Sequence, residues 1–125
     1  MTPSDKIALI VEDSAEMAET LEIALLGVPR LATHVVATVP DAVAFLKGHP
    51  VCAVLTDLNM PGMDGYELIA AIRGGGARLP ILVISGDTDP GAGAKALSLG
   101  ANAFFSKPYS PGEVRRKLEE LLNAA

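Results

Sequence analysis

Five short apolar runs, separated by longer segments with helical spacing, constrain the fold of this chain more than any other feature. The runs occupy residues 7–11, 35–37, 51–55, 81–84 and 103–105. They are continuous rather than alternating, which is typical of strands buried on both faces of a parallel sheet. The chain has 125 residues, a length that fits one domain, and we expect that domain to span residues 1–125.

The segments between the runs carry apolar side chains at the three- and four-residue spacing of amphipathic helices. Four stripes are clear: Met17, Leu21, Ala24 and Leu25; Ala42, Val43, Phe45 and Leu46; Leu68, Ile69 and Ile72; Val114, Leu118, Leu121 and Leu122. Strand and helix alternate five times. This order predicts an α/β fold, with a doubly wound five-stranded parallel sheet, helices on both faces and right-handed crossovers.

Capping residues and glycines indicate where these helices begin and end. Asp41 is the expected cap of the second helix and Ser110 that of the last. The fourth helix should begin within residues 87–94, where two glycines each lower helix stability by about 1 kcal/mol. We therefore expect it to be short or frayed at its beginning. The glycine-rich run 73–78 predicts a mobile connection before the fourth strand.

Charge and hydropathy exclude several classes of function. The formal net charge is −5, which argues against a large nucleic-acid surface because such a surface needs a basic stripe. No apolar run reaches the roughly 18 residues of a membrane-spanning helix. The first residues lack the basic-then-apolar pattern of a secretory signal. We expect a cytoplasmic protein with no membrane insertion and no direct contact with nucleic acid.

Polar side chains follow four of the five predicted strands. They are Glu12 and Asp13 after the first, Asp57 after the third, Ser85 after the fourth and Lys107 after the fifth. In sheets of this kind the functional crevice lies beyond the carboxyl ends of the strands, so these groups should converge. Three crowded carboxylates repel one another and call for a cation. Oxygen ligands without His or Cys favour a hard ion, Mg²⁺ or Mn²⁺.

Four motifs then carry a family resemblance. They are Val-Glu-Asp-Ser at 11–14, Thr-Asp-Leu-Asn-Met-Pro-Gly-Met-Asp-Gly at 56–65, Ile-Ser-Gly at 84–86 and Gly-Ala-Asn-Ala-Phe-Phe-Ser-Lys-Pro at 100–108. Over essentially the whole chain, the sequence resembles the receiver domains of bacterial response regulators, in particular single-domain, chemotaxis-regulator-like ones. The resemblance implies a flavodoxin-like receiver fold with strand order 2-1-3-4-5 and a role in two-component phosphorelay signalling.

The resemblance also implies how a phosphoryl group and a metal would be held. Asp57 would be the phosphoacceptor and would also contact the metal. Asp13 would coordinate the metal directly, Glu12 would act on it mainly through water, and the backbone carbonyl of Asn59 would supply another ligand.

Three further residues would bind the phosphoryl group or respond to it. Ser85 would donate a hydrogen bond to a phosphoryl oxygen, and Lys107 would pair with the group as a point charge. Phe104 stands at the aromatic switch position, where its ring has no hydroxyl to donate. The resemblance further implies a cis peptide bond between Lys107 and Pro108.

The expected partners are proteins. A histidine kinase or a histidine phosphotransfer protein would supply the phosphoryl group. A downstream target would bind the surface of the fourth helix, fifth strand and fifth helix. The protein would be a phosphoacceptor and not an enzyme, apart from catalysing its own phosphorylation by small donors and its own dephosphorylation.

Several alternatives stay open beside this interpretation. The chain could be a docking module that works without phosphorylation, or a receiver excised from a hybrid kinase or longer regulator. A phosphohydrolase with an aspartate nucleophile would usually carry a second aspartate two residues later, where this chain has Asn59. A binder of flavin mononucleotide would need a phosphate loop after the first strand, and Glu12, Asp13 and Glu16 oppose one.

Overall fold

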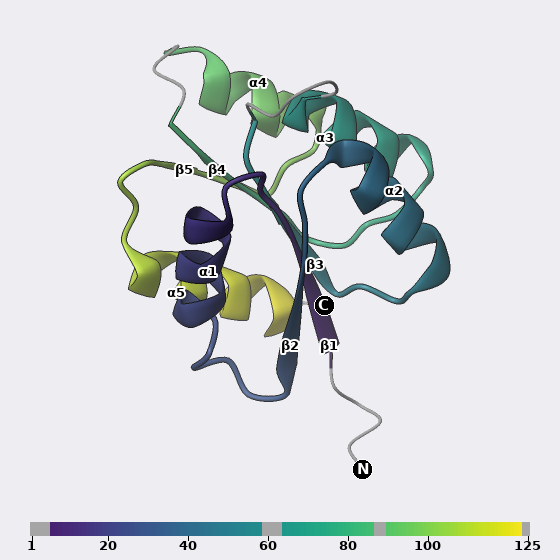
Figure 1. Cartoon of the computed structure of the whole chain (residues 1–125). Helices are drawn as coiled ribbons and strands as arrows, with labels where there is room; N and C mark the ends of the chain where they lie inside the picture. The colour runs from purple at the N-terminus through teal and green to yellow at the C-terminus, as the bar shows by residue number, and fades with distance from the viewer. Residues whose placement is uncertain (1–5, 59–63, 87–89, 124–125) are drawn as a thin grey trace.

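The fold is a five-stranded parallel sheet with helices on both faces (Figure 1). A computed structural model describes residues 6–58, 64–86 and 90–123. The strands lie in the order β2-β1-β3-β4-β5, which confirms the predicted fold class and strand order. The elements are β1 (Lys6–Val11), α1 (Ala15–Ala24), β2 (Leu31–Val36), α2 (Val39–Gly48), β3 (Ala53–Thr56), α3 (Gly65–Gly74), β4 (Ile81–Ser85), α4 (Ala92–Leu99), β5 (Ala103–Ser106) and α5 (Pro111–Asn123).

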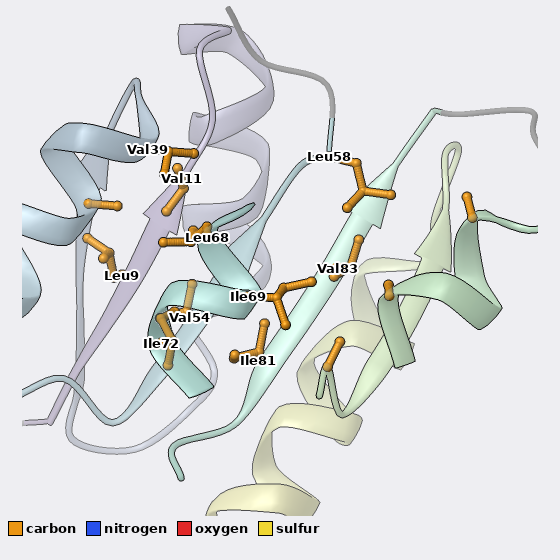
Figure 2. Close-up of a cluster of buried hydrophobic side chains, with 14 residues drawn as sticks. Leu9, Val11, Val39, Val54, Leu58, Leu68, Ile69, Ile72, Ile81 and Val83 are labelled. Carbon is orange, nitrogen blue, oxygen red and sulfur yellow. The ribbon is translucent and has the colours of Figure 1, made fainter. Parts of the chain in front are cut away.

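Two apolar cores lie on opposite faces of the sheet. Helices α1 and α5 cover one face, and α2, α3 and α4 cover the other (Figure 1). Figure 2 shows the second of these cores, in which Ile69 of α3 lies near Ile81 and Val83 of β4. Each fully buried Leu or Ile contributes about 1.5–3 kcal/mol through the hydrophobic effect. The cores therefore fix the helices against both faces of the sheet.

Alternation along the strands decides which face each side chain meets. In β1, Ala8 and Ile10 belong to the core under α1 and α5, whereas Leu9 and Val11 belong to the core under α2 and α3. Successive side chains in a strand point to opposite faces. The same alternation continues past the strand ends and, as shown below, sorts the candidate site residues between the two faces.

The edge strand and its following helix differ from the sequence-based expectation. The second strand begins at Leu31, four residues earlier than expected, because an edge strand needs apolar side chains only on its covered face. The expectation that Asp41 caps the second helix is wrong. Thr38 is the cap, and its Oγ1 accepts a hydrogen bond of 3.2 Å from the backbone N–H of Asp41. The predicted cap at Ser110 is confirmed by a 3.4 Å bond from the N–H of Glu113.

The fourth helix is short, as expected. It has eight residues and begins after Gly91, which supplies no side-chain cap. It ends at Gly100, whose φ of 117° lies in the left-handed region that favours glycine. Among the described residues, no helix is long and apolar enough to cross a membrane.

The connection predicted at 73–78 starts later than expected, because α3 continues through Gly74. The Arg73 side chain fastens this region to the turn between α4 and β5. Its guanidinium donates hydrogen bonds of 2.8–3.0 Å to the carbonyl oxygens of Ala77, Leu79 and Gly100 and to Oδ1 of Asn102.

Two glycines of α3 give opposite expectations for stability. A Cβ on Gly65 would collide with the backbone carbonyl oxygen of Asp57 and lie 2.9 Å from Cα of Leu58, whereas a Cβ on Gly74 would meet nothing within 4 Å. We expect Gly65→Ala to lower the free energy of unfolding by about 1–3 kcal/mol through overpacking. Gly74→Ala should be neutral or stabilising, by up to about 1 kcal/mol. Urea denaturation of both variants tests this, and equal effects would contradict it.

Candidate functional site at the carboxyl edge of the sheet

Three charged side chains meet where β1, β3 and β5 end. Glu12 follows β1, Asp57 follows β3 and Lys107 follows β5. Each stands two residues beyond a side chain of the core under α1 and α5, namely Ile10, Leu55 and Phe105. Because side-chain direction repeats every two residues, all three point to the same face of the sheet. This placement follows from the strand register alone.

The Lys107 ammonium lies between the two carboxylates. Its Nζ is 3.1 Å from Oδ2 of Asp57 and 3.3 Å from Oε1 of Glu12. Glu12 is 4% exposed and Asp57 is 8% exposed, so both carboxylates are largely removed from water. One positive charge therefore faces two negative charges in a poorly solvated setting, where electrostatic interactions are stronger than at the surface.

Backbone N–H groups hold both carboxylates in place. Oδ1 of Asp57 accepts a 2.6 Å hydrogen bond from the N–H of Leu58. Oε2 of Glu12 accepts a 3.2 Å bond from the N–H of Ser14, the residue that caps α1. In each carboxylate the other oxygen faces Lys107. The site is thus positioned by main chain on one side and by a single cation on the other.

Burial and charge shift two pKa values at the site. Burial raises the pKa of Glu12, as does the charge of Asp57, and the Ser14 N–H and Lys107 only partly offset this. Burial alone would lower the pKa of Lys107. The hydrogen bonds and charges of Asp57 and Glu12 outweigh this effect, so its pKa is raised overall. Both groups therefore hold a proton more readily than usual: Glu12 mainly because of burial, and Lys107 because of the two neighbouring carboxylates.

Ser85 and Phe104 lie toward the other face. Ser85 ends β4 two residues after Val83, and Phe104 is the partner of Val83 in the β4–β5 ladder. Val83 and Phe104 both belong to the core under α2, α3 and α4. Ser85 is fully buried, and its carbonyl oxygen accepts a 2.9 Å bond from the N–H of Lys107. The peptide bond between Lys107 and Pro108 is cis, as the resemblance implied.

The structure does not bring all the predicted metal ligands together. Asp13 is exposed, and among the described residues no three His, Cys, Asp or Glu side chains form a metal-binding group. Asn59 lies outside the described residues. The donor chemistry of Glu12 and Asp57 nevertheless suits a hard cation, since both are buried carboxylates that already share one positive charge. The four-ligand metal site stays a prediction.

Sequence analysis missed the contribution of neighbouring residues. Gly65 gives the backbone of Asp57 and Leu58 room, and its N–H donates a 3.0 Å bond to the Leu58 carbonyl. Thr56 Oγ1 donates a 2.8 Å bond to the Asp57 carbonyl. The Asp-Gly pair at 64–65, directly before an apolar stripe, could have indicated that a glycine is needed there. Nothing in the sequence indicates the role of Thr56.

Comparisons with known proteins show which family the chain is similar to. The response regulator receiver domain family matches residues 8–119. The transcriptional regulatory protein TctD of Salmonella typhimurium is 32% identical over 117 residues, which are 91% of this chain and 50% of that protein. The signal receiver domain of a signal transduction histidine kinase from Syntrophus aciditrophicus is 30% identical, with a TM-score of 0.86 over 96% of this chain and 92% of that chain.

A likeness of fold alone extends to more distant structures. A CheY-like response regulator receiver domain protein from Methanospirillum hungatei is 23% identical, with a TM-score of 0.88 over 97% of this chain and 96% of that chain. The chain spans about half the length of the curated relatives it matches.

Removal of the Lys107 charge should destabilise the protein in a pH-dependent way. Loss of one partner from a fully buried pair costs about 3–5 kcal/mol, and the partial exposure of Lys107 reduces this to about 2 kcal/mol for Lys107→Met. Glu12 has a raised pKa in the folded state, so its contribution to stability is present below its ordinary pKa of 4.5 and is lost as pH rises through the raised value. The penalty of Lys107→Met should therefore be larger at pH 7 than near pH 4.5.

Urea denaturation at both pH values measures this penalty. Lys117→Met is the matched control, since Lys117 forms an exposed ion pair with Glu120 at 3.5 Å. Such a surface pair is worth about 0–1 kcal/mol. A Lys107→Met penalty that matched the control, or did not depend on pH, would mean that Lys107 does not neutralise the buried carboxylates.

Proposed function

The chain belongs to the response regulator receiver domain family of two-component signalling, and we propose that it accepts a phosphoryl group on Asp57. One observation carries the proposal: the Lys107 ammonium joins the buried carboxylates of Asp57 and Glu12 at the carboxyl edge of the sheet. Receiver domains of response regulators interact with histidine kinases. The proposed donor is accordingly a histidine kinase or a histidine phosphotransfer protein.

The chemistry required of Asp57 is a nucleophilic displacement at phosphorus. A carboxylate oxygen of Asp57 forms a new bond to phosphorus while the bond to the donor's nitrogen or oxygen breaks, and the leaving group keeps the electron pair. Such transfers ask the protein for positioning and charge neutralisation rather than for covalent chemistry. The Leu58 N–H fixes one carboxylate oxygen, and Lys107 supplies positive charge beside the other.

We propose that Glu12, Asp13, Asp57 and the Asn59 backbone carbonyl hold Mg²⁺ or Mn²⁺. When bound, the ion would neutralise charge on the phosphoryl oxygens. Support comes from the donor set: two buried carboxylates carry one more negative charge than Lys107 can balance, and Asp13 adds another at the same strand end. Burial without full neutralisation raises the pKa of Glu12, so a cation at this place would relieve a real electrostatic cost.

Ser85 and Phe104 are the proposed route from the site to the surface. The side chain of Ser85 would bind a phosphoryl oxygen, and Phe104 would respond by repacking. Phe104 sits against α4: a Cβ placed on Gly93 would lie 3.2 Å from its ring. A shift of either group would therefore move the other, which makes the α4–β5–α5 surface the proposed binding site of a downstream protein. Such two-state couplings are typically worth about 1–3 kcal/mol.

A small phosphodonor tests the proposed acceptor directly. With acetyl phosphate and Mg²⁺, the intact mass of the protein should increase by one phosphoryl group, and omission of Mg²⁺ should prevent this. Asp57→Asn should not load. Asp41→Asn is the matched control because Asp41 is an exposed aspartate in the first turn of α2 and is not one of the residues proposed for the site. Loading of Asp57→Asn, or failure of the wild type with both acetyl phosphate and a kinase, would refute the proposal.

Stabilisation by Mg²⁺ tests the proposed metal ligands separately. Binding to the folded state alone should add about 2.7 kcal/mol at a concentration one hundred times the dissociation constant. We expect Asp13→Asn to abolish most of the rise in melting temperature, while Glu16→Gln, an exposed change in the first turn of α1, should leave it intact. An unchanged Mg²⁺ response in Asp13→Asn would remove Asp13 from the ligand set.

A further inference from the structure

The hydroxyl of Tyr109 is buried beside the site and has no hydrogen-bond partner among the residues that the structure describes. Tyr109 follows the cis peptide bond between Lys107 and Pro108. Its ring packs against the core under α1 and α5. A buried polar group without a partner destabilises the state that contains it. A second state of the protein that supplied an acceptor for this hydroxyl would therefore be favoured.

Glu12 is the acceptor that the fold offers. The carboxylate points to the same face of the sheet as Ile10, which is the face on which the Tyr109 ring packs. Burial raises the pKa of Tyr109, and the charges of Lys107 and Glu12 also affect it, in opposite directions. The hydroxyl is thus within electrostatic reach of both members of the pair. Lys107 carries only donors, whereas Glu12 is an acceptor when ionised.

The arrangement of the pair leaves Glu12 dependent on Lys107. Its Oε1 faces the ammonium at 3.3 Å, and its Oε2 takes the Ser14 N–H. A phosphoryl group on Asp57 would bring extra negative charge and attract Lys107 away from Glu12. The Oε1 atom would then lose its charged donor. Because Glu12 would act on the metal mainly through water, this oxygen would still have room for a direct hydrogen-bond donor, and a buried charged oxygen without one is costly.

We propose that Tyr109 is a positioning residue that donates a hydrogen bond to Glu12 when Lys107 turns to the phosphoryl group on Asp57. The inference rests on the proposed function and adds a chain-specific contact to it. In the free protein Lys107 serves both carboxylates. In the loaded protein the Lys107 ammonium contacts Asp57 and its phosphoryl group, and the Tyr109 hydroxyl donates a hydrogen bond to Glu12. The contact stabilises the loaded state alone.

Tyr109→Phe separates this role from a packing role. A hydrogen bond to a charged group is worth a factor of about ten or more in an equilibrium constant. We expect Tyr109→Phe to bind beryllofluoride, in the presence of Mg²⁺, about tenfold more weakly than wild type, with the melting temperature of the free protein unchanged or raised. Tyr66→Phe is the matched control, since it makes the same change on α3 and keeps the ring beneath Lys95. A packing role would instead lower the melting temperature and leave the affinity unchanged.

A spectroscopic measurement detects the contact itself. The chain has two tyrosines and no tryptophan, so Tyr109 is the only source of intrinsic tyrosine fluorescence in Tyr66→Phe. Beryllofluoride with Mg²⁺ should quench this fluorescence, because a carboxylate acceptor now holds the hydroxyl, and Glu12→Gln in the same background should reduce the quenching.

The outcomes distinguish this inference from the proposed function. Loading of Asp57, seen by intact mass, together with unchanged Tyr109 fluorescence and an unchanged beryllofluoride affinity in Tyr109→Phe would refute the role of Tyr109 and leave the phosphoacceptor intact. Failure of Asp57 to load would refute both.

Discussion

The rest of the candidate site depends on the contact of the Lys107 ammonium with the two buried carboxylates of Asp57 and Glu12. Lys107 reaches Asp57 and Glu12 from the edge strand β5, so β5 is tied electrostatically to β1 and β3, although β4 separates it from them. A single cation cannot balance both carboxylates, and burial together with the charge of Asp57 raises the pKa of Glu12. In the proposed function, an arriving cation or phosphoryl group would exchange partners with these three side chains.

The two faces of the sheet carry different groups of candidate site residues. The charged groups Glu12, Asp57 and Lys107 continue the side-chain alternation of the face under α1 and α5. Ser85 and Phe104 continue that of the opposite face, where α4 lies. The proposed phosphoacceptor site and the proposed readout residues are therefore separated by one layer of backbone, within which the Lys107 N–H donates a hydrogen bond to the Ser85 carbonyl. In the proposed function, a local change at Asp57 would reach α4 through these adjacent strand ends.

Most of this arrangement follows from the sequence because strand ends and side-chain alternation are local properties. The positions of Glu12, Asp57, Ser85 and Lys107 needed only the order of the strands and the rule that parallel strands share a carboxyl edge. The cap of α2 was misjudged because Thr38 and Asp41 are both good capping residues three positions apart, and only the backbone decides between them. Two of the four hydrogen bonds of Arg73, to Gly100 and Asn102, join segments distant in sequence, which no local pattern encodes.

The buried hydroxyl of Tyr109 is a feature that the fold shows and the sequence pattern does not predict. In the sequence it is an aromatic residue after a Lys-Pro pair, and its hydrophobic ring accounts for its place against the core. Phenylalanine would fill that place without burying a hydroxyl. The hydroxyl is therefore the informative atom: it adds a donor on the face of the sheet to which Glu12 points, and the present partner of Glu12, Lys107, is shared. In the proposed loaded state, the Tyr109 hydroxyl would replace Lys107 as the donor to Glu12, so that the one ammonium could turn to Asp57.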